Sequence, residues 1–204
     1  MKLGIAVAVC VSSYAFADSP YQVLANPKAT WTYDVVPKSK KKHKPTQATI
    51  AVTGVHTAGD YTIVECHATF PEPNPWPQEQ WAWMIGPEGV REVWFFNTEQ
   101  EGYTVEHLKS AYDDHYVPRA YLPPTLVKKT VHWKLERFGD EDRDYNVTGK
   151  VTKSHDTWHT AWTGRYSIPE TGDKTTYAWS TTFDPAVGFV EMCNEEGVCL
   201  RLAK

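Results

Sequence analysis

The feature that most constrains this chain is a pair of cysteines close to its C-terminal end. Cys193 and Cys199 flank residues 194–198. A loop over residues 195–197 fits a type I turn followed by a left-handed residue, and Gly197 occupies that last position without strain. Such a loop places the two cysteines directly opposite each other, with Cβ atoms roughly 4.5–5.5 Å apart. The sequence therefore predicts a Cys193–Cys199 disulfide, with two reduced thiols as the alternative.

Residues with strand chemistry occupy most of the chain. It holds 9 tryptophans and 11 tyrosines, and 14 prolines divide it into short pieces. Aromatic and β-branched residues favour strands, whereas proline interrupts them. Trp31, Tyr33 and Val35 occupy alternate positions, as in a half-buried strand. We therefore expect an all-β fold, mainly an antiparallel curved sheet or an open barrel-like sheet.

Further strand-like segments are expected to extend this sheet. Residues 47–56 and 60–70 predict one hairpin, and residues 81–85 and 90–96 predict a second hairpin around 86–89. Residues 144–202 are typical of four or five antiparallel strands. One short helix is expected at 104–112, where Thr104 can act as the N-cap.

Residues 1–17 have the pattern of an export signal. Lys2 precedes a short apolar run, and Ala15 and Ala17 supply the small residues that signal peptidase requires. We expect cleavage near Ala17, export to the periplasm or the extracellular space, and a single β-rich domain over 18–204. Lipoprotein anchoring at Cys10 remains an alternative.

Charge and hydropathy exclude some partner classes. No stretch of the mature chain approaches the ~20 apolar residues of a membrane-spanning helix. The formal net charge is −4, which argues against nucleic acid as a general partner.

Cys66 is the remaining cysteine downstream of the leader, and it lies in the strand-like run 61–68. Pairing of the other two leaves it without a disulfide partner. It is either a buried inert thiol, or it forms an intermolecular bond or serves as a reactive nucleophile.

Three tryptophans are candidates for ligand binding. Residues 70–77 contain four prolines, so this segment should be an extended loop instead of a strand or helix interior. Trp76 in this loop, together with Trp81 and Trp83, is a possible aromatic platform for a sugar or peptide. The alternative is that all three rings pack in the core.

Catalytic signatures are missing from the sequence, so no catalytic residue, cofactor or metal is expected. A hydrolase with an unrecognised site would draw on five side chains: Asp113, Asp114, His115, His155 and Glu191. It would need at least two of them within hydrogen-bond reach in a cleft. His155 and His159 lie about 13 Å apart if they share a strand, too far for one metal ion.

Five short motifs follow one another between residues 122 and 190: Leu122-Pro123-Pro124-Thr125-Leu126, Val131-His132-Trp133, Tyr145-Asn146-Val147-Thr148-Gly149-Lys150-Val151, Asp156-Thr157-Trp158 and Phe183-Asp184-Pro185-Ala186-Val187-Gly188-Phe189-Val190. In order and spacing they resemble the TapB-like group of bacterial envelope proteins, a domain-of-unknown-function family. Its members tend to show a Leu-Pro segment, a Gly-x-Trp strand, a Tyr-x-Val-x-Gly strand, a Gly-Thr-Phe strand and a closing Tyr-Ala-Pro-Gly-Val-Gly-x-Val segment. Departures occur at Thr130 or Val131, at Lys150 and at Ala186. The resemblance implies a β-rich envelope domain and supplies no catalytic residues.

The sequence thus favours an exported, non-enzymatic β-domain that binds an envelope component or an apolar ligand in the hollow of a curved sheet. Possible partners are an apolar molecule, a glycan or an envelope protein. A secreted hydrolase and a carbohydrate-binding surface protein are the alternatives.

Overall fold

The computed structural model describes residues 19–37, 46–72, 76, 79–87, 89–93, 120–123, 126, 131–135, 144–167, 172 and 174–204. A 3-10 turn, η1 (Gln22–Ala25), precedes the strands β1 (Thr30–Val36), β2 (Thr46–Ala58), β3 (Tyr61–Thr69), β4 (Gln80–Gly86), β5 (Gly89–Val93), β6 (Ala120–Leu122), β7 (Val131–Leu135), β8 (Asp144–Ser154), β9 (Thr157–Ser167), β10 (Lys174–Asp184), β11 (Gly188–Cys193) and β12 (Cys199–Leu202). The expected leader, the expected helix at 104–112 and the candidates Asp113, Asp114 and His115 lie outside the described residues.

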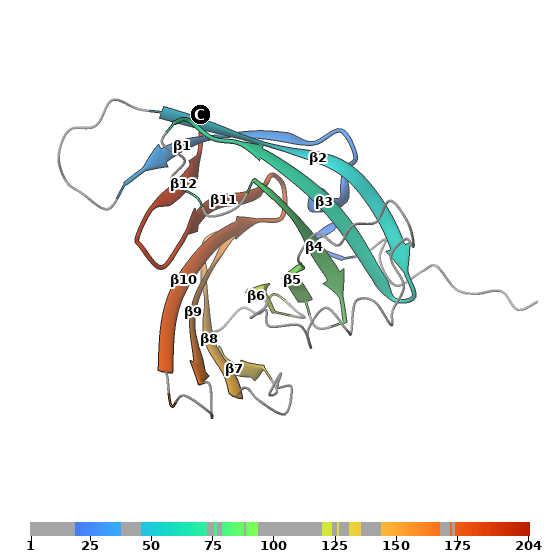
Figure 1. Ribbon diagram of the computed structural model, residues 1–204. Helices are drawn as coiled ribbons and strands as arrows, with labels where there is room; N and C mark the ends of the chain where they lie inside the picture. The colour runs from blue at the N-terminus through green and yellow to red at the C-terminus, as the bar shows by residue number, and fades with distance from the viewer. Residues whose placement is uncertain are drawn as a thin grey trace, which may run out of the picture.

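All twelve strands form one sheet in the order β6-β5-β4-β3-β2-β1-β12-β11-β10-β9-β8-β7. This order consists of two meanders of consecutive strands, joined by antiparallel pairing of β1 with β12. The sheet curls strongly, so that β7 to β10 turn away from β1 to β3 (Figure 1). At one end of the sheet, β6 lies against β9 and β10. The expectation of an all-β, antiparallel curved sheet is confirmed.

The inner face of the curl carries the main hydrophobic core. Alternate residues of the strands point inward, because successive side chains of a strand point to opposite faces. The cluster draws its aromatic members from both meanders: Tyr21, Trp31, Tyr33, Trp76, Trp81, Trp83, Phe183 and Phe189. Two side-chain hydrogen bonds cross β12 on this face. The Tyr33 hydroxyl donates to the Phe189 carbonyl at 2.9 Å, and Trp31 Nε1 donates to the Val187 carbonyl at 2.9 Å.

The outer face differs between the two meanders. On β2, β3 and β4 it holds a second buried cluster of Ala58, Ile63, Ala82 and Met84. On β9 to β12 it carries mainly polar side chains and two exposed alanines, Ala161 and Ala178. In the first meander, β2 to β4 therefore carry buried residues on both faces. The second meander is buried mainly on its inner face.

The C-terminal hairpin has the predicted geometry. Cys193 pairs directly with Cys199 in the β11–β12 register, and the two sulfurs form a disulfide. The turn is closed by backbone bonds from Gly197 to Asn194 and from Asn194 to Val198, each 3.0 Å long. Gly197 has a φ of 78°, the left-handed conformation that the predicted turn requires. The predicted disulfide is confirmed.

Candidate functional site

The three candidate tryptophans lie in the core. Trp76, Trp81 and Trp83 are 7%, 3% and 0% exposed. Of the two alternatives for these rings, an exposed platform and packing in the core, the structure shows packing in the core. The reason is that Trp81 and Trp83 occupy alternate positions of β4 and both point to the inner face, where Trp83 packs against Trp31 and Phe189 with ring centroids 6.0 and 5.2 Å apart.

Polar atoms lie next to these rings on the inner face. The indole N–H groups of Trp81 and Trp83 are buried and have no hydrogen-bond partner. Glu92 faces Trp83 across the β4–β5 pair and is itself buried. Because most buried N–H groups in proteins are paired, two orphan donors on neighbouring inward positions mark a place where a hydrogen-bond acceptor would be accommodated favourably.

A second aromatic group lines the inner face of the C-terminal meander. Trp162 of β9 pairs with Trp179 of β10, and their rings stack with centroids 6.3 Å apart. Next to them, the hydroxyls of Thr160 and Thr181 share a buried hydrogen bond of 2.6 Å. A Cβ on Gly149 of β8 would lie 2.4 Å from the Trp162 ring, so this strand position accommodates the indole only as glycine.

A small depression lies between Trp76 and Trp179. Met192, Thr181 and Asn194 also line it, and it encloses about 10 Å³, room for one water molecule. Trp76 stacks on Phe70 with ring centroids 6.4 Å apart. Trp76, which belongs to none of the described strands, thus covers the inner face of β10 and β11 with its ring.

Cys66 is a free thiol in the core, opposite Trp81 on the β3–β4 pair. Burial, and secondarily the negative charge of Glu65, raise the pKa of this thiol well above its ordinary value. The thiolate is the reactive form of cysteine. The structure therefore favours the buried inert thiol over the reactive nucleophile.

The described hydrolase candidates lie apart. His155 is at the exposed tip of the β8–β9 hairpin, where its Nδ1 is 3.4 Å from Ser154 Oγ. Glu191 lies on the outer face of β11 and accepts a hydrogen bond from Arg201 Nε at 2.5 Å. Register places Glu191 two strands from β9 and level with His159, not with His155. His155 and Glu191 therefore form no acid–base pair.

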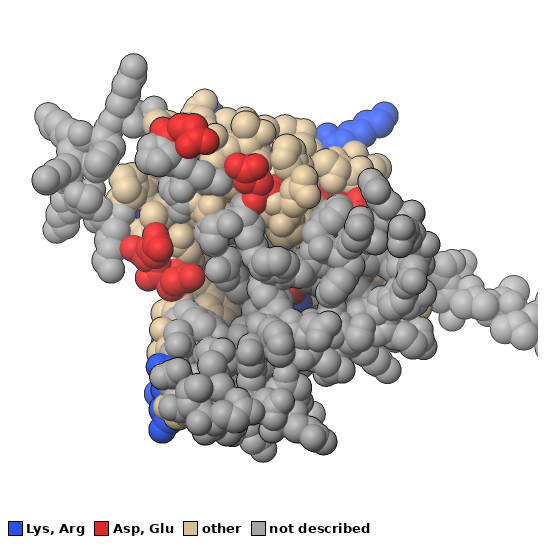
Figure 2. Space-filling view, in the orientation of Figure 1, with Lys and Arg blue, Asp and Glu red and all other residues tan. Residues whose placement is uncertain are grey.

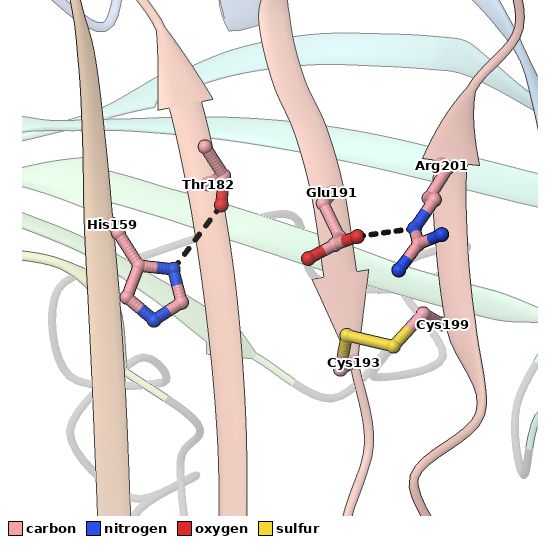
Figure 3. Close-up of polar contacts among 6 residues, drawn as sticks. All are labelled: His159, Thr182, Glu191, Cys193, Cys199 and Arg201. Atoms are coloured by element: carbon pink, nitrogen blue, oxygen red, sulfur yellow. Dashed lines mark hydrogen bonds and ion pairs between the residues drawn. A yellow bond between two sulfur atoms is a disulfide. The ribbon is translucent and has the colours of Figure 1, made fainter. Parts of the chain in front are cut away.

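His159 and Glu191 belong to a polar row that crosses the outer face of the sheet. Each member lies directly opposite the next in the strand register, and the row reads Thr152, His159, Thr182, Glu191, Arg201, Asp34 and Gln47. His159 Nδ1 lies 3.2 Å from Thr182 Oγ1 (Figure 3). Gln47 Nε2 donates to Asp34 Oδ1 at 3.1 Å. In this row the basic Arg201 lies between two acidic residues, Glu191 and Asp34. On the face drawn in Figure 2, the Asp and Glu side chains of the described residues stand in separate small patches.

A contact between two side chains on the outer face was not anticipated from the sequence. His56 Nε2 lies 3.3 Å from Glu65 Oε2 on the outer face of β2 and β3. A bulge between Val52 and Gly54 shifts the β2 register, and a Cβ at Gly54 would lie 2.3 Å from the Glu65 carboxylate. Gly54 inside a β-branched run was the available signal, because glycine within a strand often marks a bulge or a close approach.

Comparison with protein-family models, with curated proteins and with solved structures finds no match to this chain. Among the described residues, no helix is long and apolar enough to cross a membrane. The described residues form an aromatic inner face, on which the N–H groups of Trp81 and Trp83 are unpaired, and an outer face on which the Cys193–Cys199 disulfide lies next to the row of polar side chains.

Proposed function

We propose that the protein is an exported, non-enzymatic β-domain that binds an apolar ligand against the inner face of its curled sheet. The observation that carries the proposal is the depression between Trp76 and Trp179, beside the stacked Trp162–Trp179 pair. Stacked indoles present a large apolar area, and apolar pockets with a few polar groups are the usual form of a ligand site.

Binding in this place requires Trp76 to move, because the depression has room for only one water molecule. Trp76 is held by packing against Phe70 and the core, and not by a strand ladder. Displacement of its ring would open the inner face of β10 and β11, which Trp179 and Met192 line. An acyl chain or a similar apolar part of the ligand would then occupy the volume that the Trp76 ring leaves.

The unpaired N–H groups of Trp81 and Trp83 lie on the same inner face but do not line the depression, so they add a polar preference only for a ligand that extends beyond it. A ligand oxygen, such as an ester or amide carbonyl, could accept a hydrogen bond from either group and remove the desolvation cost of a buried unpaired donor. We therefore favour an amphiphile with a neutral oxygen over a pure hydrocarbon.

The export part of the proposal rests on the leader pattern at 1–17 and on the resemblance to TapB-like envelope proteins. The Cys193–Cys199 disulfide supports it, because disulfides persist in oxidising compartments outside the cytoplasm. N-terminal analysis of the protein recovered from its native cells should give Asp18 as the first residue. Recovery of an intact Met1 from the cytoplasm would contradict this part.

Ligand binding is tested with a fluorescent apolar dye such as N-phenyl-1-naphthylamine, displaced by monoacylglycerol or by dodecane. We expect the dye to bind, monoacylglycerol to displace it more effectively, and Trp179→Ala to weaken dye binding about tenfold or more. Trp76→Ala should have the opposite effect, because it removes the covering ring. His159→Ala, on the outer face of β9, is the matched control and should change nothing.

Absence of dye binding in both the wild-type protein and Trp76→Ala would overturn the proposal. The same holds if Trp179→Ala and His159→Ala bind equally well. The chain would then be a structural or interaction module whose aromatic residues serve packing alone.

A further inference from the structure

The C-terminal hairpin brings three side chains of metal-binding types together on the outer face of the sheet. Within the described part of the chain, one group of His, Cys, Asp and Glu donors is close enough to share an ion: Glu191, Cys193 and Cys199, whose ligand atoms all lie within 4.8 Å of one another. All three residues are partly exposed, so an ion could reach them from solvent. In the oxidised protein the two sulfurs are bonded to each other and are not thiolate ligands.

We infer that reduction of the Cys193–Cys199 disulfide converts this hairpin into a binding site for a thiophilic divalent ion such as Zn²⁺. A dithiol reductant supplies two electrons and two protons: its own sulfurs become a disulfide, the Cys193–Cys199 bond breaks, and each cysteine becomes a thiol. The metal ion then displaces both protons into solvent and accepts an electron pair from each thiolate. Glu191 supplies a third ligand, and water the fourth.

The strand register suits this coordination. The two cysteines are directly opposite each other, with Cα atoms 4.1 Å apart. With Zn–S bonds near 2.3 Å in a tetrahedral site, two sulfurs lie about 3.8 Å apart. Rotation of the two side chains can reach this separation without moving either strand, because both already project from the same face.

The hairpin does not depend on the disulfide for its place in the sheet. β12 lies between β11 and β1 and is paired with both. On the inner face, Met192 and Leu200 pair across the hairpin and are buried in the core. Opening the sulfur bridge on the outer face therefore leaves the strand ladder and the core contacts in place, and the donors stay organised.

Arg201 holds Glu191 in a suitable orientation. Its Nε donates to Glu191 Oε2 (Figure 3), which leaves Oε1 for a metal ion. Hydrogen bonds of this kind orient carboxylate ligands in many metal sites. Two thiolates and one carboxylate carry three negative charges, and the arginine and a divalent ion carry three positive charges. The assembled site is therefore neutral.

The test uses the full mature protein, oxidised or reduced with tris(2-carboxyethyl)phosphine, titrated with Cd²⁺ and Co²⁺ and followed by thiolate-to-metal charge-transfer absorption. We expect one ion per chain in the reduced protein and none in the oxidised protein. Glu191→Gln should weaken binding by at least about tenfold, since loss of even an outer-shell partner of a metal ligand has effects of this size. Cys199→Ser should abolish the charge-transfer band. Glu196→Gln, in the adjacent turn, is the matched control and should bind like the wild type.

Several results would overturn the inference. One is a reduced protein that binds no more metal than the oxidised protein. Another is equal affinity in Glu191→Gln and Glu196→Gln, which would remove the carboxylate from the site. A third is loss of the β-sheet circular dichroism on reduction alone, because the site requires the reduced hairpin to remain in the sheet.

Discussion

The two meanders of the sheet share one topology and differ in how their faces are used. In the first, β3 and β4 bury both faces: Trp83 points into the inner core and Ile63 into the outer cluster. In the second, β9 to β11 bury Trp162 and Met192 on the inner face, whereas the outer face carries the polar row through Glu191. An antiparallel sheet can thus change along its width from a two-sided to a one-sided core.

The halves nevertheless form one unit. β1 and β12 join them by backbone pairing, and we call this β1–β12 pair the seam. The Tyr33–Phe189 and Trp31–Val187 hydrogen bonds connect the two halves at the seam on the inner face. Because these bonds tie residues near both ends of the described chain, we expect a single cooperative unfolding transition. The contrast between the halves should therefore appear in how much a substitution in each half lowers the free energy of unfolding for this one transition.

The largest effect should come from the outer face of the first meander. Ile63→Ala removes a fully buried side chain, and we expect a loss of about 2–5 kcal/mol in the free energy of unfolding. His159→Ala, on the outer face of the second meander, should stay within about 0.5 kcal/mol of the wild type. Urea denaturation of both variants measures the difference. Equal losses would show that the two outer faces are not used differently.

The inner face of the second meander should be sensitive to added volume. Gly149→Ala places a methyl group 2.4 Å from the Trp162 ring, and we expect a loss of about 1–3 kcal/mol because the indole must shift. The loss should shrink when Trp162 is replaced by leucine in the same chain. A double-mutant cycle measures this coupling, and the absence of coupling would mean that Gly149 has another role.

Features that depend on local geometry could be predicted from the sequence. The Cys193–Cys199 pairing depends on a short turn whose geometry fixes the register, so local rules were sufficient. The hairpins expected at 47–70 and 81–96 correspond to β2–β3 and β4–β5 for the same reason. Alternation also placed Trp31, Tyr33 and Val35 correctly on one face, and all three are buried.

Other features depend on contacts between residues far apart in the chain. The β1–β12 seam pairs Tyr33 with Leu202, and no local signal indicates this partner. The burial of Trp76 and Trp81 likewise depends on how tightly the sheet curls. The His56–Glu65 pair arises from a bulge, which changes the faces of all later residues in β2. The candidate site was therefore less predictable than the fold.

The main core should be sensitive to high pH, because it contains two buried tyrosines, Tyr21 and Tyr33. Burial raises the pKa of Tyr21 and Tyr33 far above the ordinary value of 10.0. Below pH 10 both residues are protonated in the folded and unfolded states. Above it the unfolded chain ionises first and binds fewer protons, so the free energy of unfolding should fall by about 1.4 kcal/mol per pH unit for each tyrosine.

Tyr33→Phe should remove about half of the tyrosine contribution to this alkaline slope, as measured by denaturation at a series of pH values. Its stability at neutral pH should fall by about 1 kcal/mol, through loss of the hydrogen bond to Phe189. An unchanged slope would mean that the Tyr33 hydroxyl ionises freely in the folded protein and that the seam is open to solvent.

The smallest effect should come from the ion pair in the outer polar row. The side chains of Arg201 and Glu191 are 56% and 28% exposed, so solvent screens their attraction. A double-mutant cycle with Glu191→Gln and Arg201→Met in the oxidised protein should give a coupling below about 1 kcal/mol, which falls further in high salt. A coupling above about 2 kcal/mol that persists in salt would show that the row acts as an energetically connected network. The outer face of the second meander would then stabilise the fold as its inner face does, and the contrast between the two halves of the sheet would no longer hold.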